Sequence, residues 1–404
     1  MRQATIRQCA ILAGGLGTRL GAITETTPKP ILDVGGRPFL FWLMREMLRF
    51  GVEEFVLLTG HLSDSVEASV RSVAATLPRP VTLQFSVEPV RAGTGGALHH
   101  AATLLNERFL LCNGDSLFDC NLATLLLEAA ADDPGCVGHM LLRRIEDASR
   151  YGVVSLESNR ISAFHARPPA GTPGTINAGV YVFERTILDH VTPICSLERD
   201  VLPGLAASGG LSGTLADGWF IDIGIPEDLA RARAELRARL TRPAVFFDRD
   251  GVLNIDHGHV GTRDRWEWIA GAKEAIGLAT RSGRHVFVVT NQSGVARGFY
   301  NEAAVHALLT WVAEEVRLAG GTIDDFRYCP HHPEAGSPPY RRFCDCRKPA
   351  PGMLRELVSA WDLDPAACVM IGDKETDMEA ARAVGISGHL FTGGRLDTFL
   401  RPLL

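Results

Sequence analysis

The sequence has no long apolar run, no internal repeat and no excess of positive charge. Its longest candidate for a membrane span, Pro38–Met44, is far shorter than the roughly 18 residues that such a helix needs. Against 41 Lys and Arg stand 47 Asp and Glu, which gives a formal net charge of −6 at pH 7. A mildly acidic chain has no general attraction for nucleic acid or for an anionic membrane, so any phosphate-binding site has to be local.

A secretion signal is also missing. The apolar run Cys9–Leu12 breaks at Gly14-Gly15, and no cleavage pattern of small residues follows it. The nine cysteines are odd in number and unevenly spread, so without a secretion signal we expect reduced thiols or metal ligands. These absences lead us to expect a cytoplasmic protein with neither nucleic acid nor membrane as a partner.

The composition that is present is that of a globular α/β protein. Apolar residues make up 46% of the 404 residues and charged residues 22%, which is ordinary for a soluble protein. Short apolar runs alternate with helical stretches, a pattern typical of α/β domains with mostly parallel sheets. The stretch Pro226–Leu240 is predicted to be a helix that ends before Thr241-Arg242-Pro243. We place a domain boundary there, which gives one domain at 1–240 and another at 243–404.

Apolar runs of strand length occur in both predicted domains. In the first domain the predicted strands are Cys9–Leu12, Glu54–Leu58, Val81–Val87, Phe109–Cys112, Cys136–Leu142 and Asn177–Phe183. In the second they are Ala244–Phe247, His285–Thr290 and Cys368–Ile371. Polar motifs follow several of these strands directly, and in parallel α/β sheets the ligands bind at the carboxyl ends of the strands.

A glycine-rich turn follows the first predicted strand. Its bare backbone N–H groups can cradle phosphate oxygens, and Arg19 places a cation beside them. The turn is not a nucleoside-triphosphate P-loop, because the Lys-Ser/Thr ending is missing, and Leu20 replaces the third glycine of the dinucleotide fingerprint. Taken alone, the turn is equally consistent with a plain strand–turn–helix connection. The residues expected to contact a triphosphate there are Gly14, Gly15, Gly17 and Thr18.

Three more charged residues join this turn as candidates for phosphate and metal binding. Lys29 stands between two prolines, and Asp115 comes just after a buried strand. A second aspartate, Asp222, follows the run Trp219-Phe220-Ile221. Two carboxylates together with phosphate oxygens form a ligand set suited to Mg²⁺. The alternative for each aspartate is a structural role in a turn or helix cap.

With these motifs the first domain resembles the sugar-1-phosphate nucleotidyltransferase family. The motifs are Leu12–Leu20, Pro28-Lys29-Pro30, Asn113-Gly114-Asp115, Asn177-Ala178-Gly179 and Trp219–Gly224. The resemblance implies a Rossmann-like three-layer fold of the glycosyltransferase-A type and a reaction that joins a nucleoside triphosphate to a sugar 1-phosphate with release of pyrophosphate. It also implies that Arg19 steadies the triphosphate and that Lys29 neutralises the sugar phosphate or the developing charge. Asp115 and Asp222 would share Mg²⁺.

The resemblance extends to the base and sugar sites, with one departure. The segment Glu88–Ala97 resembles the loop for base and ribose, in which Thr94 and Gly95 would be contacts. Asn177 would contact a sugar hydroxyl or cap a turn. The family often carries Phe-x-Glu-Lys-Pro at the sugar site, whereas Phe164–Pro168 has no glutamate and has arginine in place of lysine. The motifs are similar to the heptose and mannose 1-phosphate guanylyltransferase branch, which implies GTP as the substrate.

The second domain carries four ordered polar motifs that begin with two aspartates two positions apart. The motifs are Asp248-Arg249-Asp250-Gly251, Thr290-Asn291-Gln292-Ser293, Arg347-Lys348-Pro349 and Gly372-Asp373-Lys374-Glu375-Thr376-Asp377. Two adjacent carboxylates crowd negative charge, which Mg²⁺ would relieve while it holds a phosphate against one of them. In order and content these motifs resemble the haloacid dehalogenase superfamily of phosphatases, which use an aspartate nucleophile and have a Rossmann-like three-layer fold.

This second resemblance implies a role for each polar residue. Asp248 would attack phosphorus to form an aspartyl-phosphate, and Asp250 would protonate the leaving group and then activate water. Asp373 would complete a Mg²⁺ site with Asp248 and the backbone carbonyl of Asp250. The residues implied to hold the phosphoryl oxygens are Thr290, Asn291 and Lys348.

A zinc site is predicted from cysteine and histidine spacing. Cys329 and His331 precede Cys344 and Cys346 by a short segment rich in proline and glycine. Three sulfurs and one imidazole make a closed tetrahedral set with no position open for water, so the site is expected to be structural. A disulfide between these cysteines is not expected in a reducing compartment. His332, beside the cluster, is expected at the surface.

The zinc motif reduces the number of candidate substrates for the second domain. Within the superfamily it resembles the heptose 1,7-bisphosphate 7-phosphatases and the histidinol-phosphate phosphatases. Arg347 and Lys374 resemble the heptose enzymes, in which they would serve the second phosphate of a bisphosphate. Removal of a 7-phosphate yields a sugar 1-phosphate, which is the substrate implied for the first domain, so we expect two consecutive steps toward a GDP-heptose. The alternatives are a histidinol-phosphate phosphatase in the second domain and a non-catalytic regulatory protein.

Overall fold

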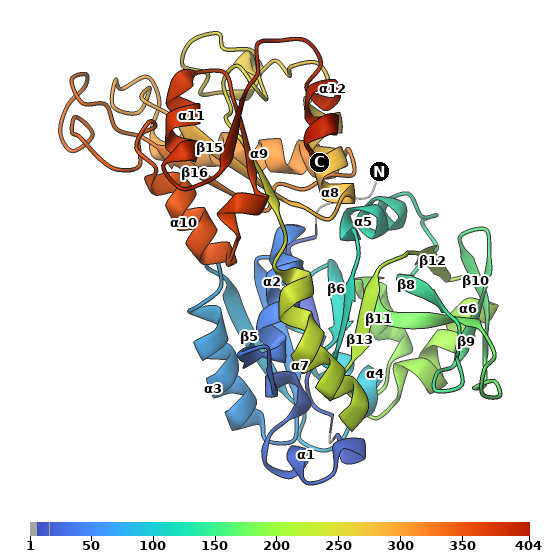
Figure 1. The fold of residues 1–404 in the computed structure, drawn as a ribbon. Coiled ribbons are helices and arrows are strands. Elements are labelled where there is room, and N and C mark those ends of the chain that lie inside the picture. Colours follow the sequence, from blue (N-terminus) through green and yellow to red (C-terminus); the bar gives the residue numbers. More distant parts are fainter. Residues whose placement is uncertain (1–5, 16) are drawn as a thin grey trace. The chain divides into compact units, whose positions relative to one another are not determined.

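The computed structural model describes residues 6–15 and 17–404. The chain divides into two compact units, Met1–Arg237 and Ala238–Leu404, drawn blue to yellow-green and yellow-green to red in Figure 1. Both are α/β, as predicted from the alternation of strands and helices. The division falls inside α7 (Pro226–Leu240), whose bounds match the predicted helix.

The first unit contains a nine-stranded sheet in the order β5-β4-β1-β6-β11-β8-β12-β10-β9. In chain order its strands are β1 (Gln8–Leu12), β4 (Glu54–Thr59), β5 (Thr82–Val87), β6 (Arg108–Asn113), β8 (Gly138–Ile145), β9 (Val153–Glu157), β10 (Arg160–His165), β11 (Gly174–Glu184) and β12 (Leu211–Leu215). The strands β5, β4, β1 and β6 are parallel. β12 is also parallel to β8, but the prediction of a mostly parallel sheet is wrong elsewhere, because β11 runs antiparallel to β6 and β8 and because β9 and β10 form an antiparallel pair.

Helices and two short ribbons complete the first unit. The helices are α1 (Ile23–Thr26), α2 (Phe39–Arg49), α3 (Ser63–Ala74), α4 (Gly93–His100), α5 (Leu122–Ala130) and α6 (Leu202–Ala207). One ribbon pairs β2 (Asp33–Val34) with β3 (Arg37–Pro38), and the other pairs β7 (Ser116–Asp119) with β13 (Trp219–Asp222). Packing between helices and sheet forms a core that includes Phe109, Leu111, Tyr181 and Phe183, all fully buried.

The second unit has a five-stranded parallel sheet in the order β16-β15-β14-β17-β18. Its strands are β14 (Ala244–Phe247), β15 (His285–Asn291), β16 (Asp325–Cys329), β17 (Val369–Gly372) and β18 (Ser387–Leu390). Its helices are α8 (Ala272–Arg281), α9 (Glu302–Arg317), α10 (Gly352–Trp361), α11 (Glu375–Arg382) and α12 (Leu396–Leu400).

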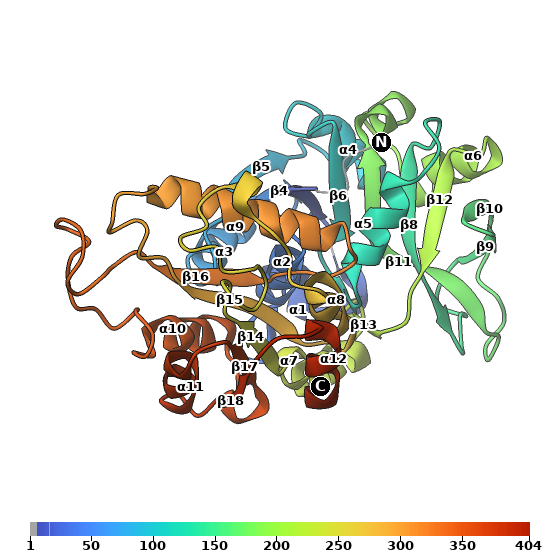
Figure 2. The same ribbon diagram turned by 90° about the horizontal axis from the view of Figure 1, so that it is seen from above.

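Alternation along the central strand explains the three layers of this unit. Val245 and Phe247 belong to a core shared with α8, α9 and α12, whereas Ala244 and Phe246 belong to a core shared with α10 and α11. Successive side chains of a strand point to opposite faces, so a strand that is apolar throughout needs helices on both sides. Figure 2 shows α9 on one side of the strands β15 and β16 and α10 and α11 on the other.

Each strand predicted from the sequence overlaps a strand of the structure. The sequence analysis did not predict β9, β10 and β12 in the first unit, or the edge strands β16 and β18 in the second. It noted the apolar run of β13 without its pairing to β7. In the described part of the chain, no helix is long and apolar enough to cross a membrane.

Candidate active sites

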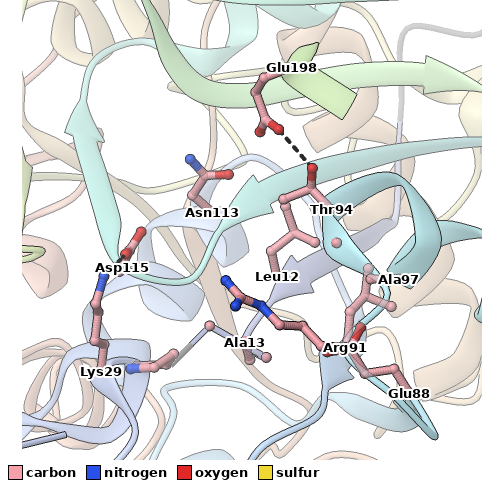
Figure 3. Close-up of a pocket in the computed structure, with 15 residues that line it drawn as sticks. Leu12, Ala13, Lys29, Glu88, Arg91, Thr94, Ala97, Asn113, Asp115 and Glu198 are labelled. Atoms are coloured by element: carbon pink, nitrogen blue, oxygen red, sulfur yellow. Dashed lines mark hydrogen bonds and ion pairs between the residues drawn. The ribbon is translucent and has the colours of Figure 1, made fainter. Parts of the chain in front are cut away.

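In the first unit, a cavity of about 310 Å³ opens beside the glycine-rich turn. Gly14 and Gly15, which follow the carboxyl end of β1, form one wall, and Lys29 and Asp115 form another. Figure 3 shows these two side chains directed toward each other, with Arg91 also lining the cavity. Leu16, in the middle of the turn, lies outside the described residues. The turn and the predicted lysine and aspartate are therefore brought together at the end of a parallel strand, where α/β ligand sites occur.

An ion pair joins Lys29 to Asp115, with 2.9 Å between Nζ and Oδ2. Lys29 is buried at the start of η2 (Lys29–Ile31). Gly17 has φ of +67°, and a Cβ on it would lie 3.0 Å from Lys29 Cε and 2.7 Å from Thr24 Cγ2. Only glycine fits this left-handed and crowded position without strain. The absence of a side chain at Gly17 therefore leaves the space that the Lys29 side chain occupies.

The β7–β13 ribbon brings the two predicted aspartates of the first unit together. Asp222 pairs with Ser116, the neighbour of Asp115, and the backbone N–H of Ile223 donates to the Asp115 carbonyl at 2.9 Å. Burial raises the pKa of the Asp222 carboxyl, and the nearby charge of Asp115 raises it further. Repulsion of this kind is relieved by a divalent cation, so the donor set fits Mg²⁺ shared with phosphate oxygens.

Arg19 lies next to Asp222. It belongs to η1 (Thr18–Leu20), and a Cβ placed on Gly224 would be 2.8 Å from both Arg19 Nη2 and Asp222 Oδ1. Gly224 also donates its backbone N–H to Asp222 Oδ1 at 2.8 Å. Both Thr18 and Arg19 are exposed, so this cation is accessible to a ligand.

Two predicted ligand contacts are used inside the fold. The Gly95 N–H donates to the Cys195 carbonyl at 3.0 Å, which leaves this N–H without a role in reading a base. Asn177 donates from Nδ2 to Tyr181 Oη at 2.6 Å and accepts the Gly179 N–H at 2.9 Å. These bonds are those of the turn cap that the sequence analysis kept as the alternative for Asn177.

Thr94 does line the cavity, together with an acidic residue that the sequence analysis did not consider. Its hydroxyl donates to Glu198 Oε2 at 2.7 Å and accepts the Leu197 N–H at 2.8 Å (Figure 3). Glu198 lies in a single π-helical turn, Leu197–Val201. Glu88, another lining residue without a predicted role, accepts the Ala92 N–H at 3.1 Å. Glu88 belongs to the segment Glu88–Ala97, which the sequence analysis identified as the loop for base and ribose. No local sequence pattern indicated that Glu198 would lie at the same cavity.

The second unit has a polar cavity of about 420 Å³ at the carboxyl ends of its central strands. In the register of the sheet, Phe247 pairs with Val288 and with Ile371. The residues that follow these strands therefore meet at one edge. Asp248, Asp373 and Asp377 have carboxylate oxygens within 4.8 Å of one another and could hold a metal ion. The first two were predicted as ligands, but Asp377 was not assigned a role.

A buried lysine links two of these carboxylates. Lys348 Nζ lies 2.8 Å from Asp248 Oδ1 and 2.6 Å from Asp377 Oδ1, and it also donates to the Val289 carbonyl at 2.9 Å. Burial raises the pKa of the Asp248 carboxyl to about 6 in spite of this ion pair. The nucleophile proposed from the sequence thus depends on nearby positive charge to stay ionised.

Asp373 has a buried oxygen that is suited to a metal ion. Its Oδ1 has no hydrogen-bond partner within the described residues. Gly251, at φ of +87°, brings the backbone so close that a Cβ would lie 2.4 Å from Asp373 Oδ2. A buried carboxylate oxygen without a partner is costly, and a cation satisfies it. The residues therefore fit the Mg²⁺ implied by the sequence.

Asp250 is held away from the other acids by donors. Arg249 Nη2 lies 2.8 Å from both of its oxygens, Gln292 Nε2 donates to Oδ2 at 2.9 Å, and Asn254 Nδ2 donates to Oδ1 at 3.0 Å. Burial alone would raise the pKa of Asp250, but the charge and hydrogen bonds of Arg249 hold that pKa below its ordinary value. The carboxylate is thus oriented by three donors. Sequence reasoning gave Arg249 and Gln292 no role.

Thr290 and Asn291 both lie at the cavity, but their side chains contact other polar groups. Asn291 pairs with the backbone of Lys348, donating to its carbonyl at 3.0 Å and accepting its N–H at 3.1 Å. The Thr290 hydroxyl accepts Gln292 Nε2 at 2.8 Å. Asn291 therefore positions the lysine in addition to any contact with phosphate.

The four predicted zinc ligands form one cluster. The three sulfurs are separated by 3.3 to 3.5 Å, and His331 Nδ1 lies 3.3 Å from Cys346 Sγ. Sulfurs around tetrahedral zinc lie about 3.8 Å apart, since each Zn–S bond is about 2.3 Å long. Burial raises the pKa of the Cys329 thiol to about 11, so a cation is needed to keep it as thiolate. The donor set fits zinc.

The zinc cluster is connected to the cavity through Arg347. This residue follows Cys346 directly, lines the cavity and donates from Nη1 to the His331 carbonyl at 3.1 Å. Lys374, another lining residue, is exposed and lies 3.5 Å from both Asp256 and Asp373. The cavity therefore has two cations beyond Lys348.

His332 is partly exposed beside the zinc cluster, in line with the expected surface position. Its Nδ1 accepts the N–H groups of Glu334 and Ala335 at 3.1 and 2.8 Å. It thus closes a turn beside the zinc cluster.

Comparison with known families agrees with both sites. The family model described as Nucleotidyl transferase matches residues 9–239, and one described as HAD-hydrolase-like matches residues 345–398. The chain belongs to the nucleotidyl transferase family. The solved structure of HddC from Yersinia pseudotuberculosis is similar to this part, with 29% identity, a TM-score of 0.50 and coverage of 57% of this chain and 100% of HddC. A second HddC structure, with the same values, is described as complexed with GMP-PN.

The second unit has relatives named D-glycero-beta-D-manno-heptose-1,7-bisphosphate 7-phosphatase. The one from Rhodopseudomonas palustris is 46% identical over 163 residues, which are 40% of this chain and 91% of the relative. The one from Vibrio cholerae is 44% identical over 147 residues, 36% of this chain and 79% of the relative. The chain is therefore an enzyme in which a nucleotidyltransferase domain is fused to a phosphatase domain. Both kinds of enzyme use divalent metals.

The zinc cluster of the phosphatase domain leads to a first prediction. Purified enzyme should contain about one zinc per chain, as expected for one closed four-ligand site. Cys344→Ser should lower the zinc content and destabilise the phosphatase domain, and phosphatase activity should fall because Arg347 loses its support on His331. Metal analysis by mass spectrometry and phosphate release measure both effects, and nucleotidyl transfer serves as the internal control. Zinc-free protein with full phosphatase activity would contradict the assignment.

The contact between Gly251 and Asp373 leads to a second prediction. In Gly251→Ala the new methyl group displaces the Asp373 carboxylate, so the Mg²⁺ concentration for half-maximal phosphatase activity should rise at least about tenfold. Gly283→Ala is the matched control, because Gly283 also has positive φ (+77°) but nothing within 4 Å of a Cβ. Left-handed strain should cost both variants about 1 kcal/mol of unfolding free energy. Equal Mg²⁺ dependence in the two variants would refute a metal role for Asp373.

Proposed function

We propose that the enzyme catalyses two consecutive steps toward a nucleotide-activated heptose. The phosphatase domain removes the 7-phosphate of D-glycero-D-manno-heptose 1,7-bisphosphate, and the nucleotidyltransferase domain joins the heptose 1-phosphate to a nucleotidyl group. The observation that carries this proposal is the fusion itself. A domain that spans 91% of a heptose bisphosphate phosphatase is joined to a family member whose substrate class is that phosphatase's product.

In the phosphatase step Asp248 is the nucleophile. Its carboxylate oxygen attacks the phosphorus of the 7-phosphate, the P–O7 bond breaks, and an aspartyl-phosphate forms. Lys348, at 2.8 Å from Asp248, keeps the carboxylate ionised and stabilises charge on the phosphoryl oxygens. Asn291 positions that lysine through its backbone, and Thr290 lines the phosphate end of the cavity.

Asp250 moves the protons. In its protonated form it gives a proton to the leaving O7 alkoxide. The carboxylate that remains, which is the form that Arg249 favours, then takes a proton from the water that hydrolyses the aspartyl-phosphate, which returns Asp248 and releases phosphate. Arg249 and Gln292 fix the orientation of its two oxygens. Mg²⁺, held by Asp248, Asp373, Asp377 and the Asp250 carbonyl, would neutralise the charge of the phosphoryl group.

Two cationic residues favour a bisphosphate over an amine monophosphate such as histidinol phosphate as the substrate. Arg347 and Lys374 line the cavity in addition to Lys348, which supplies charge for a second phosphate. A substrate with a cationic amine would be repelled by the same two residues. The non-catalytic alternative is disfavoured because Asp248, Asp250 and Lys348, the groups that the proposed mechanism needs, all line one cavity.

In the transfer step the reaction is mainly positioning and neutralisation of charge. A phosphate oxygen of heptose 1-phosphate attacks the α-phosphorus of the triphosphate, and pyrophosphate leaves. Backbone N–H groups at Gly14, Gly15 and Thr18, together with Arg19, would hold the triphosphate. Lys29 would neutralise the attacking phosphate, and Asp115 and Asp222 would hold a Mg²⁺ that supplies positive charge to the phosphates.

GTP is the triphosphate that we propose. The HddC structure complexed with GMP-PN supports a guanine nucleotide in a relative of 29% identity. Thr94 and Glu198 stand at the wall of the cavity opposite the catalytic lysine, where they can reach the ribose and base. A glutamate carboxylate accepts hydrogen bonds, and guanine offers N1–H and N2–H donors on one edge.

The separation of the two active sites gives a third prediction. Asp248→Asn should lower phosphate release more than about a thousandfold, because no covalent bond to the nucleophile can form. Transfer to added heptose 1-phosphate should stay near the wild-type rate. Asp222→Ala is the reciprocal control, which should lose pyrophosphate release and keep the phosphatase. Loss of both activities in either soluble, folded variant would show that the domains depend on each other catalytically.

The proposed pair of reactions has a direct test. Wild-type enzyme is incubated with heptose 1,7-bisphosphate and each of the four nucleoside triphosphates, and the products are identified by mass spectrometry. We expect phosphate, pyrophosphate and a GDP-heptose, with GTP consumed at least about tenfold faster than the other triphosphates. Histidinol phosphate is assayed in parallel. Faster phosphate release from histidinol phosphate, or no nucleotide sugar with any triphosphate, would overturn the proposed function.

A further inference from the structure

Two loops of the phosphatase domain meet at the mouth of its cavity. One runs from Asp256 to Gly261, and the other from Gln292 to Tyr300. Tyr300 fastens them together, because its ring leaves no room for a Cβ on either Gly261 (2.2 Å) or Gly294 (2.3 Å). Its hydroxyl donates to Gln292 Oε1 at 2.8 Å, and Gln292 in turn contacts Asp250. Tyr300 therefore connects the two loops to each other and, through Gln292, to Asp250.

A strained residue stands on the first loop. His259 has φ of +53°, a conformation in which residues with a side chain are uncommon, and it lines the cavity. Arg265 holds the loop in this shape by donating to the carbonyls of His257, Gly258 and His259 at 2.8, 3.0 and 3.2 Å. Backbone strain that the surroundings maintain in this way is concentrated at binding and catalytic sites.

An exposed aromatic ring on the second loop faces His259. Phe299 is 63% exposed, and its ring centroid lies 4.9 Å from that of His259. A phenylalanine left in water beside a polar cavity contributes nothing to the core, so the exposure calls for another explanation. His259 lines the cavity, and Phe299 continues from its ring as exposed apolar surface.

We propose that the His259–Phe299 pair is a specificity element that binds the carbon chain of the sugar phosphate. The His259 ring contacts the C–H face of the substrate, and Phe299 positions that ring and extends its apolar surface. This inference rests on the proposed function, because it names the residues that would bind the carbon chain between the two phosphates of the proposed substrate.

The charges of the cavity explain why such a surface is needed. Lys348 serves the reacting phosphate, and Arg347 and Lys374 are available for the other end. Charged groups give little discrimination between carbon chains that carry the same phosphates. Ligand sites add such discrimination with aromatic walls, against which the apolar C–H groups of a sugar can pack.

The test compares two substrates of different length in variants of both rings. Acetyl phosphate carries the reacting phosphate on only two carbons, whereas heptose 1,7-bisphosphate has the seven-carbon chain that the proposal places against the rings. We measure kcat and KM for both in wild type, Phe299→Ala, Phe299→Leu and His259→Asn. Asparagine tolerates positive φ, so His259→Asn removes the ring and keeps the loop conformation. Phe343→Ala is the control, because Phe343 is an 88% exposed phenylalanine of the same domain whose ring is not the one paired with His259.

We expect the ratio of kcat/KM for heptose bisphosphate to kcat/KM for acetyl phosphate to fall about tenfold in Phe299→Ala and His259→Asn, which corresponds to about 1.4 kcal/mol. The loss should appear in KM for the bisphosphate, with partial rescue in Phe299→Leu and no change of the ratio in Phe343→Ala. An unchanged ratio in both ring variants, or equal losses for both substrates, would overturn the inference. The wild-type preference for heptose bisphosphate tests the proposed function separately, since it does not depend on any variant.

Discussion

The repulsion between carboxylates at the ends of parallel strands is the constraint on which the phosphatase domain depends. Asp248, Asp373 and Asp377 share a volume less than 5 Å across, and a fold that gathers them has to supply positive charge. Lys348 supplies part of it from a fully buried position that Asn291 and the Val289 carbonyl define. The remaining deficit of positive charge is seen in the raised pKa of Asp248 and in an Asp373 oxygen that has no hydrogen-bond partner among the described residues. This deficit is the electrostatic reason for a metal there.

The nucleotidyltransferase domain also brings carboxylates close together, and it compensates their repulsion with other structural elements. Asp115 and Asp222 are more than a hundred positions apart, and a two-stranded ribbon outside the main sheet places them side by side. Lys29 and Arg19 contribute the compensating charge from the glycine-rich turn and the segment that follows it. In both domains a lysine is preset against a carboxylate before substrate arrives, which favours charge stabilisation over binding alone.

The sequence allowed prediction of the features that depend on strand ends and on local spacing. The α/β class, helix α7, the strands before Asp115 and Asp248, and the zinc cluster all follow from short-range patterns. Features that depend on hydrogen bonds between distant segments could not be predicted. Gly95 was expected to meet a ligand, but its N–H is used by the carbonyl of Cys195, a hundred positions away, whose proximity no local pattern reveals. The mixed character of the first sheet likewise depends on the direction of β11, which is set by tertiary pairing.

The packing of Tyr300 between two glycines also has an evolutionary consequence. Because Gly261 and Gly294 both border one ring, neither position can gain a side chain while the tyrosine remains. A homologue that carries alanine or a larger residue at either glycine should therefore carry a smaller residue in place of Tyr300. The three positions are expected to change together, so that a change at any of them requires a coordinated replacement and not an independent single step.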